Sequence, residues 1–155
     1  MASALLVFLV ACSSKPKTEE IAGEPDGSVT NEAMSFDVTG SDSGSIEGLK
    51  SITFEYDRAS LTSEARGILS NNANWIKNFK GTVQVEGHCD ERGTIEYNLA
   101  LGERRAVSVK NYLVSLGVAS NKLTIISYGE EKPLVRGESE DAWGRNRRAN
   151  FVPLQ

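Results

Sequence analysis

The sequence predicts an α/β sandwich with few strands, and two observations support this fold class. Short segments rich in β-branched residues alternate between apolar and polar positions, and two long stretches between them carry apolar residues at helical spacing. Strands that alternate with helices along a chain typically form a sheet with helices packed against it. The length of 155 residues allows one ordinary domain plus extensions, and a hydrophobic content of 39% is sufficient for a core.

The first half of the expected domain contains two strands and a helix. Residues 51–57 alternate in polarity and are rich in β-branched side chains, which predicts a strand. Thr62 or Ser63 is expected to cap a helix that Gly81 then closes. Residues 82–88 form the second expected strand. The predicted core-facing positions of the helix are Ala65, Ile68, Leu69, Ala73, Ile76 and Phe79.

The second half of the expected domain begins with the longest helix, over residues 94–116, for which Gly117 is the stop signal. Residues 123–128 predict a third strand, residues 139–147 a short helix and residues 148–152 a closing strand. The predicted apolar stripe of the long helix consists of Ile95, Leu99, Gly102, Ala106, Val109, Leu113 and Leu116.

The N-terminal segment is expected to be a lipoprotein signal peptide. Residues 1–11 are uncharged and almost wholly apolar, too short to span a bilayer but typical of the apolar core of a secretory signal. The run LVA at 9–11 stands directly before Cys12, which is the pattern of a bacterial lipobox, in which the cysteine thiol receives the lipid. No Lys or Arg precedes the apolar run, and a misplaced or truncated start of the sequence would explain why these basic residues are missing. An ordinary apolar N-terminus with a chance cysteine is the alternative.

Residues 12–50 are expected to form the acylated cysteine and a flexible acidic linker, and residues 51–155 the domain. The linker is rich in Ser, Pro, Gly, Lys and Glu, and has too few apolar residues to offset the entropy of ordering. Only residues 34–38 alternate like a short strand. Residues 12–51 carry three positive and eight negative charges, whereas the rest carries 14 positive and 13 negative. This lack of basic excess argues against a nucleic-acid partner.

Charged and polar residues that suit a small ligand gather in residues 87–106, GHCDERGTIEYNLALGERRA. In the long helix, Asn98, Leu101 and Arg105 lie at i, i+3 and i+7, in a strip beside the apolar stripe. Asp90 lies in the turn before this helix. A guanidinium binds a carboxylate through two parallel hydrogen bonds, and a carboxylate binds an ammonium, so the set suits a zwitterion. An ordinary ion pair between Arg105 and Asp90 is the alternative.

Several segments occur in the order that is typical of one family. They are the pair Tyr56-Asp57, the GH-x-D turn that ends at Asp90, the L-x-x-R-R-A segment that contains Arg105, and the final NRR at 146–148. Over about residues 52–152 the chain resembles the OmpA-like peptidoglycan-binding domain, and the lipobox narrows the resemblance to the peptidoglycan-associated lipoproteins of the Tol–Pal system. The family fold is a mixed four-stranded sheet with its helices on one face.

The resemblance implies a ligand, a location and partners. The ligand is the diaminopimelate of the peptidoglycan stem peptide. The protein is implied to be an outer-membrane lipoprotein, with Ser13 favouring outer-membrane sorting, whose domain faces the periplasm and binds TolB. Its role is to tether the outer membrane to the wall and to support envelope integrity and constriction at division. Another OmpA-like lipoprotein without a Tol partner is the alternative. The implied binding residues are Asp90, Arg105, Asp57, Tyr56, Leu101 and Asn98, supported by Arg147, Arg148 and Gly93.

Catalysis, a metal site and a cofactor are not expected. A zinc amidase needs a cluster of His, Asp or Cys ligands, and His88 is the single histidine. His88 and Cys89 cannot act together on a strand, because neighbouring side chains point to opposite faces. His88 is instead expected to be a structural hydrogen-bond donor. Cys89 is expected to be a small, partly buried hydrophobe without an intrachain disulfide once Cys12 is acylated, and a redox or dimerising role is the alternative.

Overall fold

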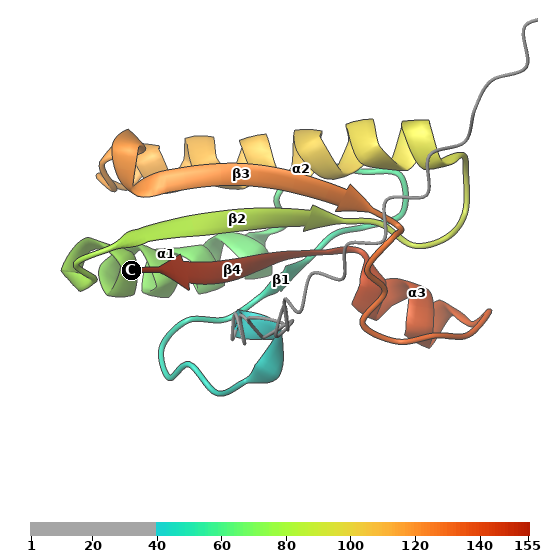
Figure 1. The fold of residues 1–155 in the computed structure, drawn as a ribbon, viewed down its shortest axis with the longest axis horizontal. Helices are drawn as coiled ribbons and strands as arrows, with labels where there is room; N and C mark the ends of the chain where they lie inside the picture. The colour runs from blue at the N-terminus through green and yellow to red at the C-terminus, as the bar shows by residue number, and fades with distance from the viewer. Residues whose placement is uncertain (1–39) are drawn as a thin grey trace, which may run out of the picture. The chain divides into compact units, whose positions relative to one another are not determined.

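The computed structural model describes residues 40–155, so the expected signal peptide, Cys12, most of the expected linker and the strand-like run 34–38 lie outside the described residues. The described part confirms the predicted fold class, with helices α1 and α2 on one face of a mixed four-stranded sheet (Figure 1). No helix in it combines the length and apolar character needed to cross a membrane. The elements are η1 (Ser41–Ser43), β1 (Ile52–Thr53), α1 (Ser63–Asn78), β2 (Thr82–His88), α2 (Ile95–Ser115), η2 (Ser120–Lys122), β3 (Leu123–Gly129), α3 (Glu140–Asn146) and β4 (Arg148–Leu154).

The strand order of the sheet is β1-β4-β2-β3. Strand β4 is antiparallel to both β1 and β2, and β2 is parallel to β3. Because β1 and β2 both oppose β4, they run in the same direction and end at the same edge of the sheet. Residues that follow these two strands are therefore brought together, although the strands are not neighbours.

The hydrophobic core lies between the sheet and the two long helices. Strand residues such as Val85 and Phe151 are opposite each other on β2 and β4 and fully buried. They pack in one cluster with the apolar face of α1. Four of the six positions that were predicted to face the core on this helix are buried. The main helical members of the cluster are Ala65, Leu69, Ala73, Ile76, Ala106, Val109 and Leu113.

The first half of α2 departs from the predicted stripe. Ile95, expected in the core, is 50% exposed. The buried residues in the first half of the helix are Asn98, Leu101 and Arg105 together with the predicted Gly102, and the predicted Ala106, Val109 and Leu113 are buried further along. The polar strip therefore faces the interior where α2 begins, and the apolar stripe takes over where α2 crosses the sheet.

Two glycines allow α2 to lie directly against β2. A Cβ atom on Gly87 would overlap the carbonyl of Gly102 in α2, and a Cβ on Gly102 would overlap the Ser127 hydroxyl of β3. The side chains of any other residues would hold the helix away from the sheet at these points. The close approach brings the start of α2 next to the end of β2.

The helix ends confirm Thr62 as a cap of α1 and Gly117 as the stop of α2, but not the role expected of Gly81. Thr62 and Thr94 accept hydrogen bonds from backbone amides in the first turns of α1 and α2, and Gly117 ends α2 with a φ of 89°. Gly81 does not supply such a conformation, since α1 ends at Asn78 with an extended residue after it. Glycine is needed at 81 because a Cβ there would overlap the Leu154 carbonyl.

Two expected boundaries are corrected by the structure. The strand expected over 51–57 pairs only at Ile52–Thr53, so that Tyr56 and Asp57 lie in a turn. The folded part also begins before residue 51, because Leu49 is only 1% exposed and belongs to the core. The hydroxyl of Ser41 donates to the Asn150 side chain of β4 at 2.7 Å, which fixes the segment 40–50 on the sheet.

Candidate functional site

The candidate site is a narrow pocket where β1 and β2 end and α2 begins. The structure brings together all six residues that the resemblance implies as ligand-binding, together with four others. The common edge of β1 and β2 explains why the turn at 56–57 and the turn after β2 meet there. The lining residues are Tyr56, Asp57, Cys89, Asp90, Arg92, Tyr97, Asn98, Leu101, Arg105 and Arg147.

Arg105 is the largest fully buried side chain, with an exposed fraction of 0%. Its guanidinium donates to the carbonyls of Arg58 at 2.8 Å, His88 at 2.7 Å and Glu55 at 3.2 Å. Within the described residues no carboxylate lies within 4.0 Å of it. Burial lowers the pKa of Arg105 below its usual value. The ion pair with Asp90, which was the alternative to a ligand site, is therefore not formed.

This environment favours an anionic group at Arg105. Burying a cation is costly unless an opposite charge compensates it, and carbonyl dipoles alone supply only part of that compensation. A planar guanidinium held in one orientation can bind a carboxylate through two parallel hydrogen bonds. Because the backbone carbonyls fix its orientation, Arg105 is pre-organised to receive such a group.

Asp90 is nearly as buried, with an exposed fraction of 3%. Its carboxylate accepts hydrogen bonds from Arg92 at 2.7 Å and from Arg147 at 3.1 Å. Burial raises the pKa of Asp90, but the hydrogen bonds from the two arginines outweigh burial, so the pKa lies below its usual value. The carboxylate is therefore ionised at neutral pH and supplies the fixed negative charge of the pocket.

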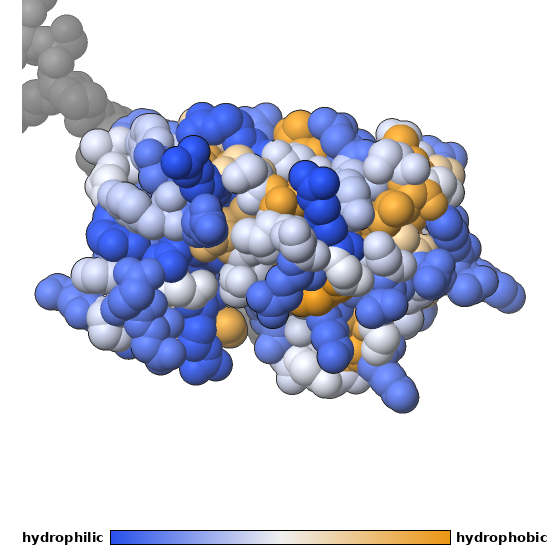
Figure 2. All heavy atoms as spheres, turned by 180° about the vertical axis from the view of Figure 1, so that it is seen from behind, coloured by the Kyte–Doolittle hydropathy of each residue, from blue (hydrophilic) through white to orange (hydrophobic). Residues whose placement is uncertain are grey.

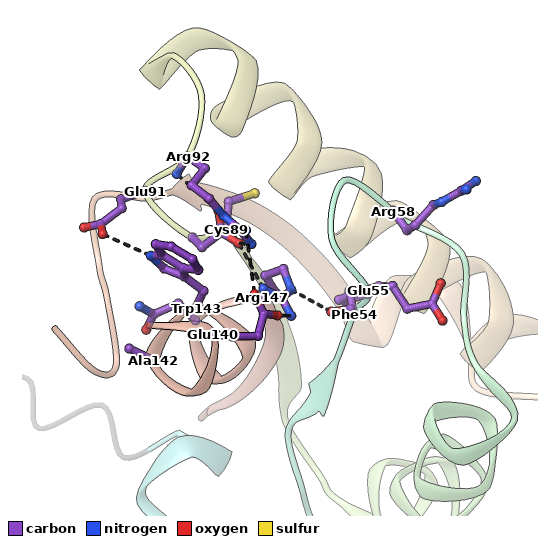
Figure 3. Close-up of polar contacts among 12 residues, drawn as sticks. Phe54, Glu55, Arg58, Cys89, Glu91, Arg92, Glu140, Ala142, Trp143 and Arg147 are labelled. Atoms are coloured by element: carbon purple, nitrogen blue, oxygen red, sulfur yellow. Dashed lines mark hydrogen bonds and ion pairs between the residues drawn. The ribbon is translucent and has the colours of Figure 1, made fainter. Parts of the chain in front are cut away.

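Arg92 lines the pocket, although the resemblance does not imply it as a binding residue. Its guanidinium lies 4.1 Å from the ring centres of both Tyr56 and Trp143 while it pairs with Asp90. Figure 3 shows the indole of Trp143 beside this arginine, and its Nε1–H donates to Glu91 at 3.0 Å. Cation–π contacts on two rings fix the position of Arg92 at the mouth of the pocket.

Asn98 holds the turn between β2 and α2. Its amide donates to the backbone carbonyl of Asp90 at 3.1 Å and to the carboxylate of Glu130. Gly93, in the same turn, has a φ of 127°, a backbone angle that favours glycine. Asn98 therefore lines the pocket and also fixes the backbone on which Asp90 is carried.

The turn after β1 contributes Asp57, whose φ of 53° is unusual for a residue other than glycine. Its carboxylate accepts a hydrogen bond from the hydroxyl of Tyr97 on α2. The carboxylate is exposed at the mouth, unlike that of Asp90. The pocket thus carries one buried and one accessible carboxylate.

The two expected supporting arginines lie on different sides of β4. Arg147 donates to Asp90, to the Phe54 carbonyl at 3.1 Å and to Glu140 at 2.5 Å, as the dashed lines in Figure 3 show in part. Arg148 instead donates to Asp42 at 2.8 Å and does not line the pocket. Arg148 therefore lies outside the lining of the pocket, and its supporting role stays a prediction.

His88 and Cys89 differ from what was expected of them. His88 is buried, but neither ring nitrogen has a hydrogen-bond partner among residues 40–155, and Nε2 lies 3.6 Å from the carboxylate of Glu86. It is therefore not the expected structural donor, and burial lowers its pKa. Cys89 is fully rather than partly buried, donates to the Asn98 carbonyl at 3.3 Å, and has its pKa raised by burial. Within residues 40–155 no three acidic, His or Cys side chains are grouped as metal ligands would be.

Comparisons with known proteins agree with this architecture. The model of the OmpA family matches residues 53–147. The peptidoglycan-associated lipoprotein of Pseudomonas aeruginosa is 41% identical over 94% of this chain and 90% of its own length. The crystal structure of the peptidoglycan-associated lipoprotein from Burkholderia pseudomallei is 38% identical and covers 67% of this chain and 89% of that one, with a TM-score of 0.65.

A more distant likeness supports the fold alone. The C-terminal domain of Helicobacter pylori MotB is 22% identical and superposes with a TM-score of 0.65 over 70% of this chain and 86% of its own. The sheet with helices on one face is therefore shared beyond the lipoproteins. With the family model matched over more than half of the chain and a relative above 40% identity along most of it, the chain belongs to the OmpA family.

Proposed function

We propose that this chain is a peptidoglycan-binding lipoprotein whose pocket holds the diaminopimelate residue of the stem peptide. The observation that carries the proposal is Arg105, a buried guanidinium with carbonyl partners and no carboxylate within 4.0 Å in the described part of the chain. The names of the relatives at about 40% identity support the same ligand class. Membership of the OmpA family supports a binding role without catalysis.

The pocket matches the two charges of an amino-acid head group. Three arginines and two aspartates line it, and Asp90 already pairs with two of the arginines. Arg105 is the cation left for the ligand carboxylate, whereas Asp57 and Asp90 supply negative charge for the ammonium. Leu101 provides the apolar wall. Diaminopimelate presents such a carboxylate and ammonium on one carbon at the end of its side chain.

Binding requires side chains at the mouth to move. The pocket has a volume of about 20 Å³, which is enough for a water molecule but not for a head group. Tyr56 is 56% exposed, and the Arg92 side chain is also in contact with solvent. Changes of side-chain rotamer are common when a ligand binds, whereas the buried Arg105 and Asp90 keep their backbone supports.

The type of wall tests this assignment of the ligand. Walls with lysine in place of diaminopimelate lack the terminal carboxylate that Arg105 is proposed to bind. Losing one partner of a buried charged pair costs about 2 kcal/mol or more, so the purified chain should bind lysine-type walls about 30-fold more weakly. Sedimentation with both kinds of purified sacculi measures the difference. Equal retention on the two walls would show that the terminal carboxylate is not recognised.

We further propose that Cys12 is acylated, that the domain faces the periplasm from the outer membrane, and that the protein acts in the Tol–Pal system. In this role it tethers the membrane to the wall and supports envelope integrity and constriction at division. Cys12 lies outside the described residues, so this part rests on the lipobox and on the lipoprotein relatives.

Capture of TolB separates this role from that of an OmpA-like lipoprotein without a Tol partner. The purified chain, immobilised, should retain purified TolB, and soluble diaminopimelate-containing muropeptide should reduce the retention if the two surfaces overlap. A chain that binds sacculi normally but retains no TolB would belong to the alternative class.

A further inference from the structure

A second hollow lies on the outer side of α1 and shares no residue with the candidate site. It has a volume of about 550 Å³, much more than the pocket at Arg105. It lies over the second half of α1, which in Figure 1 runs at the end of the sheet away from α3. Its lining residues are Gly48, Asn71, Asn74, Trp75, Asn78 and Phe79.

The lining of this groove is uncharged and rich in amides. Asn71, Asn74 and Asn78 stand at i, i+3 and i+7 and therefore share one face of α1. A carboxamide both donates and accepts hydrogen bonds, so the row can match hydroxyl and acetamido groups. No side chain that lines this first hollow carries a charge, which disfavours phosphates, nucleic acids and charged peptide ends there.

An aromatic pair forms the floor of the same groove. The rings of Trp75 and Phe79 stack with their centres 4.9 Å apart, and both are partly exposed. Gly48 has a φ of 82°, and a Cβ there would lie 3.1 Å from the indole Cδ1. The missing side chain therefore leaves the edge of Trp75 open. Aromatic rings beside hydrogen-bonding amides suit the C–H face and the hydroxyl edge of a pyranose.

The groove continues along the helix. An adjoining hollow of about 410 Å³ shares Gly48 and Asn71 with the first, and its lining also includes the charged residues Glu47 and Lys50. Its wall is fixed, because the buried amide of Asn72 donates to the Lys50 carbonyl at 2.7 Å and accepts from the Lys50 amide at 3.0 Å. Two connected hollows of this kind suit a linear ligand rather than a single small molecule.

We propose that this groove binds a glycan strand made of N-acetylated hexosamines. The biological source of the strand, the wall polymer, rests on the proposed function, whereas the ligand chemistry rests on the groove itself. A second copy of the chain is a weaker candidate, because homodimer interfaces are mainly apolar and the groove is dominated by exposed asparagines. Figure 2, which views the molecule from behind, shows apolar patches scattered among polar side chains rather than one large apolar face.

Titration of the full chain with a tetramer of N-acetylglucosamine tests the proposal. Calorimetry should detect binding to the parent protein. The double variant Asn71→Ala, Asn74→Ala should weaken that binding about tenfold or more, because two hydrogen-bonding amides are lost. Both positions are exposed on a helix, where alanine is favourable, so the fold should persist. Ser70→Ala, exposed on the same helix outside the groove, should bind as the parent does.

A variant of the other site separates the two proposals. Arg105→Lys should bind the tetramer normally, whatever its retention on sacculi. Failure of the parent to bind the tetramer, or equal binding by the double variant, would overturn the glycan proposal and leave the diaminopimelate pocket untouched. If the parent dimerises and the double variant does not, the groove binds a second copy of the chain. If residues 1–39 are protected from protease in the parent but not in the double variant, the groove binds that segment. Either result would also overturn the proposal.

Discussion

Replacement of Arg105 by alanine is expected to abolish retention on diaminopimelate-type sacculi. The ligand carboxylate would lose its only proposed guanidinium partner, and removing one member of a desolvated charged pair typically costs about 2–5 kcal/mol of binding free energy. Sedimentation of the variant with purified sacculi, over a range of protein concentrations, measures the loss. The effect is large because Arg105 is fully buried, so solvent cannot replace the missing contact.

The same change also affects the fold, which requires a second variant. Without Arg105 the buried carbonyl of His88 and the part-buried carbonyls of Glu55 and Arg58 lose a donor. A buried acceptor left alone costs about 1–3 kcal/mol. Arg105→Lys keeps the positive charge but not the forked guanidinium, so it should weaken binding while preserving more of the fold's stability than Arg105→Ala does. Arg104→Ala is the matched control, since this neighbouring arginine is exposed. Retention of both Arg105 variants at the parental level would dismiss the proposed site.

Asp90→Asn is expected to remove wall binding and to lower the free energy of unfolding as well. The amide keeps the shape of the side chain but removes the charge that faces Arg92 and Arg147. Arg147 is only 8% exposed, and breaking a buried pair by removing one partner typically costs about 3–5 kcal/mol. Urea unfolding at pH 7 should show this loss. Asp57→Asn, whose carboxylate is exposed and pairs with no arginine in the described structure, should leave stability nearly unchanged.

The pH dependence of stability gives an independent measure of the Asp90 pairs. The folded pKa of Asp90 lies below the ordinary value of 3.8. The pairs therefore stabilise the fold fully above that value, and their contribution is lost as the pH falls through the lower folded pKa. The difference in unfolding free energy between the parent and Asp90→Asn should thus shrink below about pH 4. A difference that stays constant from pH 7 to pH 3 would show that ionised Asp90 does not stabilise the fold.

The sequence could predict the order of elements and, through the family resemblance, six of the ten residues that line the pocket, but not which face of α2 is buried at its start. Periodicity places the strip of Asn98, Leu101 and Arg105 beside the apolar stripe, and two adjacent strips are equally consistent with a helical pattern. The choice depends on tertiary structure, since α2 begins beyond the edge of the sheet, over the turns that follow β1 and β2. Exposed Ile95 is the consequence.

The sequence also could not predict contacts between residues that lie far apart along the chain. Arg92 stacks on Trp143, and the pair becomes visible only when α3 folds back beside the turn after β2. Arg148 is the first residue of β4 and Arg147 lies directly before it, so the sequence could not decide which of these adjacent arginines reaches the pocket.

The divergence of Arg147 and Arg148 also determines how the domain can carry mechanical load. Arg148 forms an ion pair with Asp42, near the point where the described chain begins, and Arg147 forms an ion pair with Asp90 in the pocket. A pull between the N-terminal segment and a ligand thus has a route through two ion pairs and one peptide bond at the start of β4. This route does not cross the apolar core between the sheet and the helices. If the chain is anchored at Cys12 and bound to the wall as proposed, tension would pass along the end of the sheet where β4 begins.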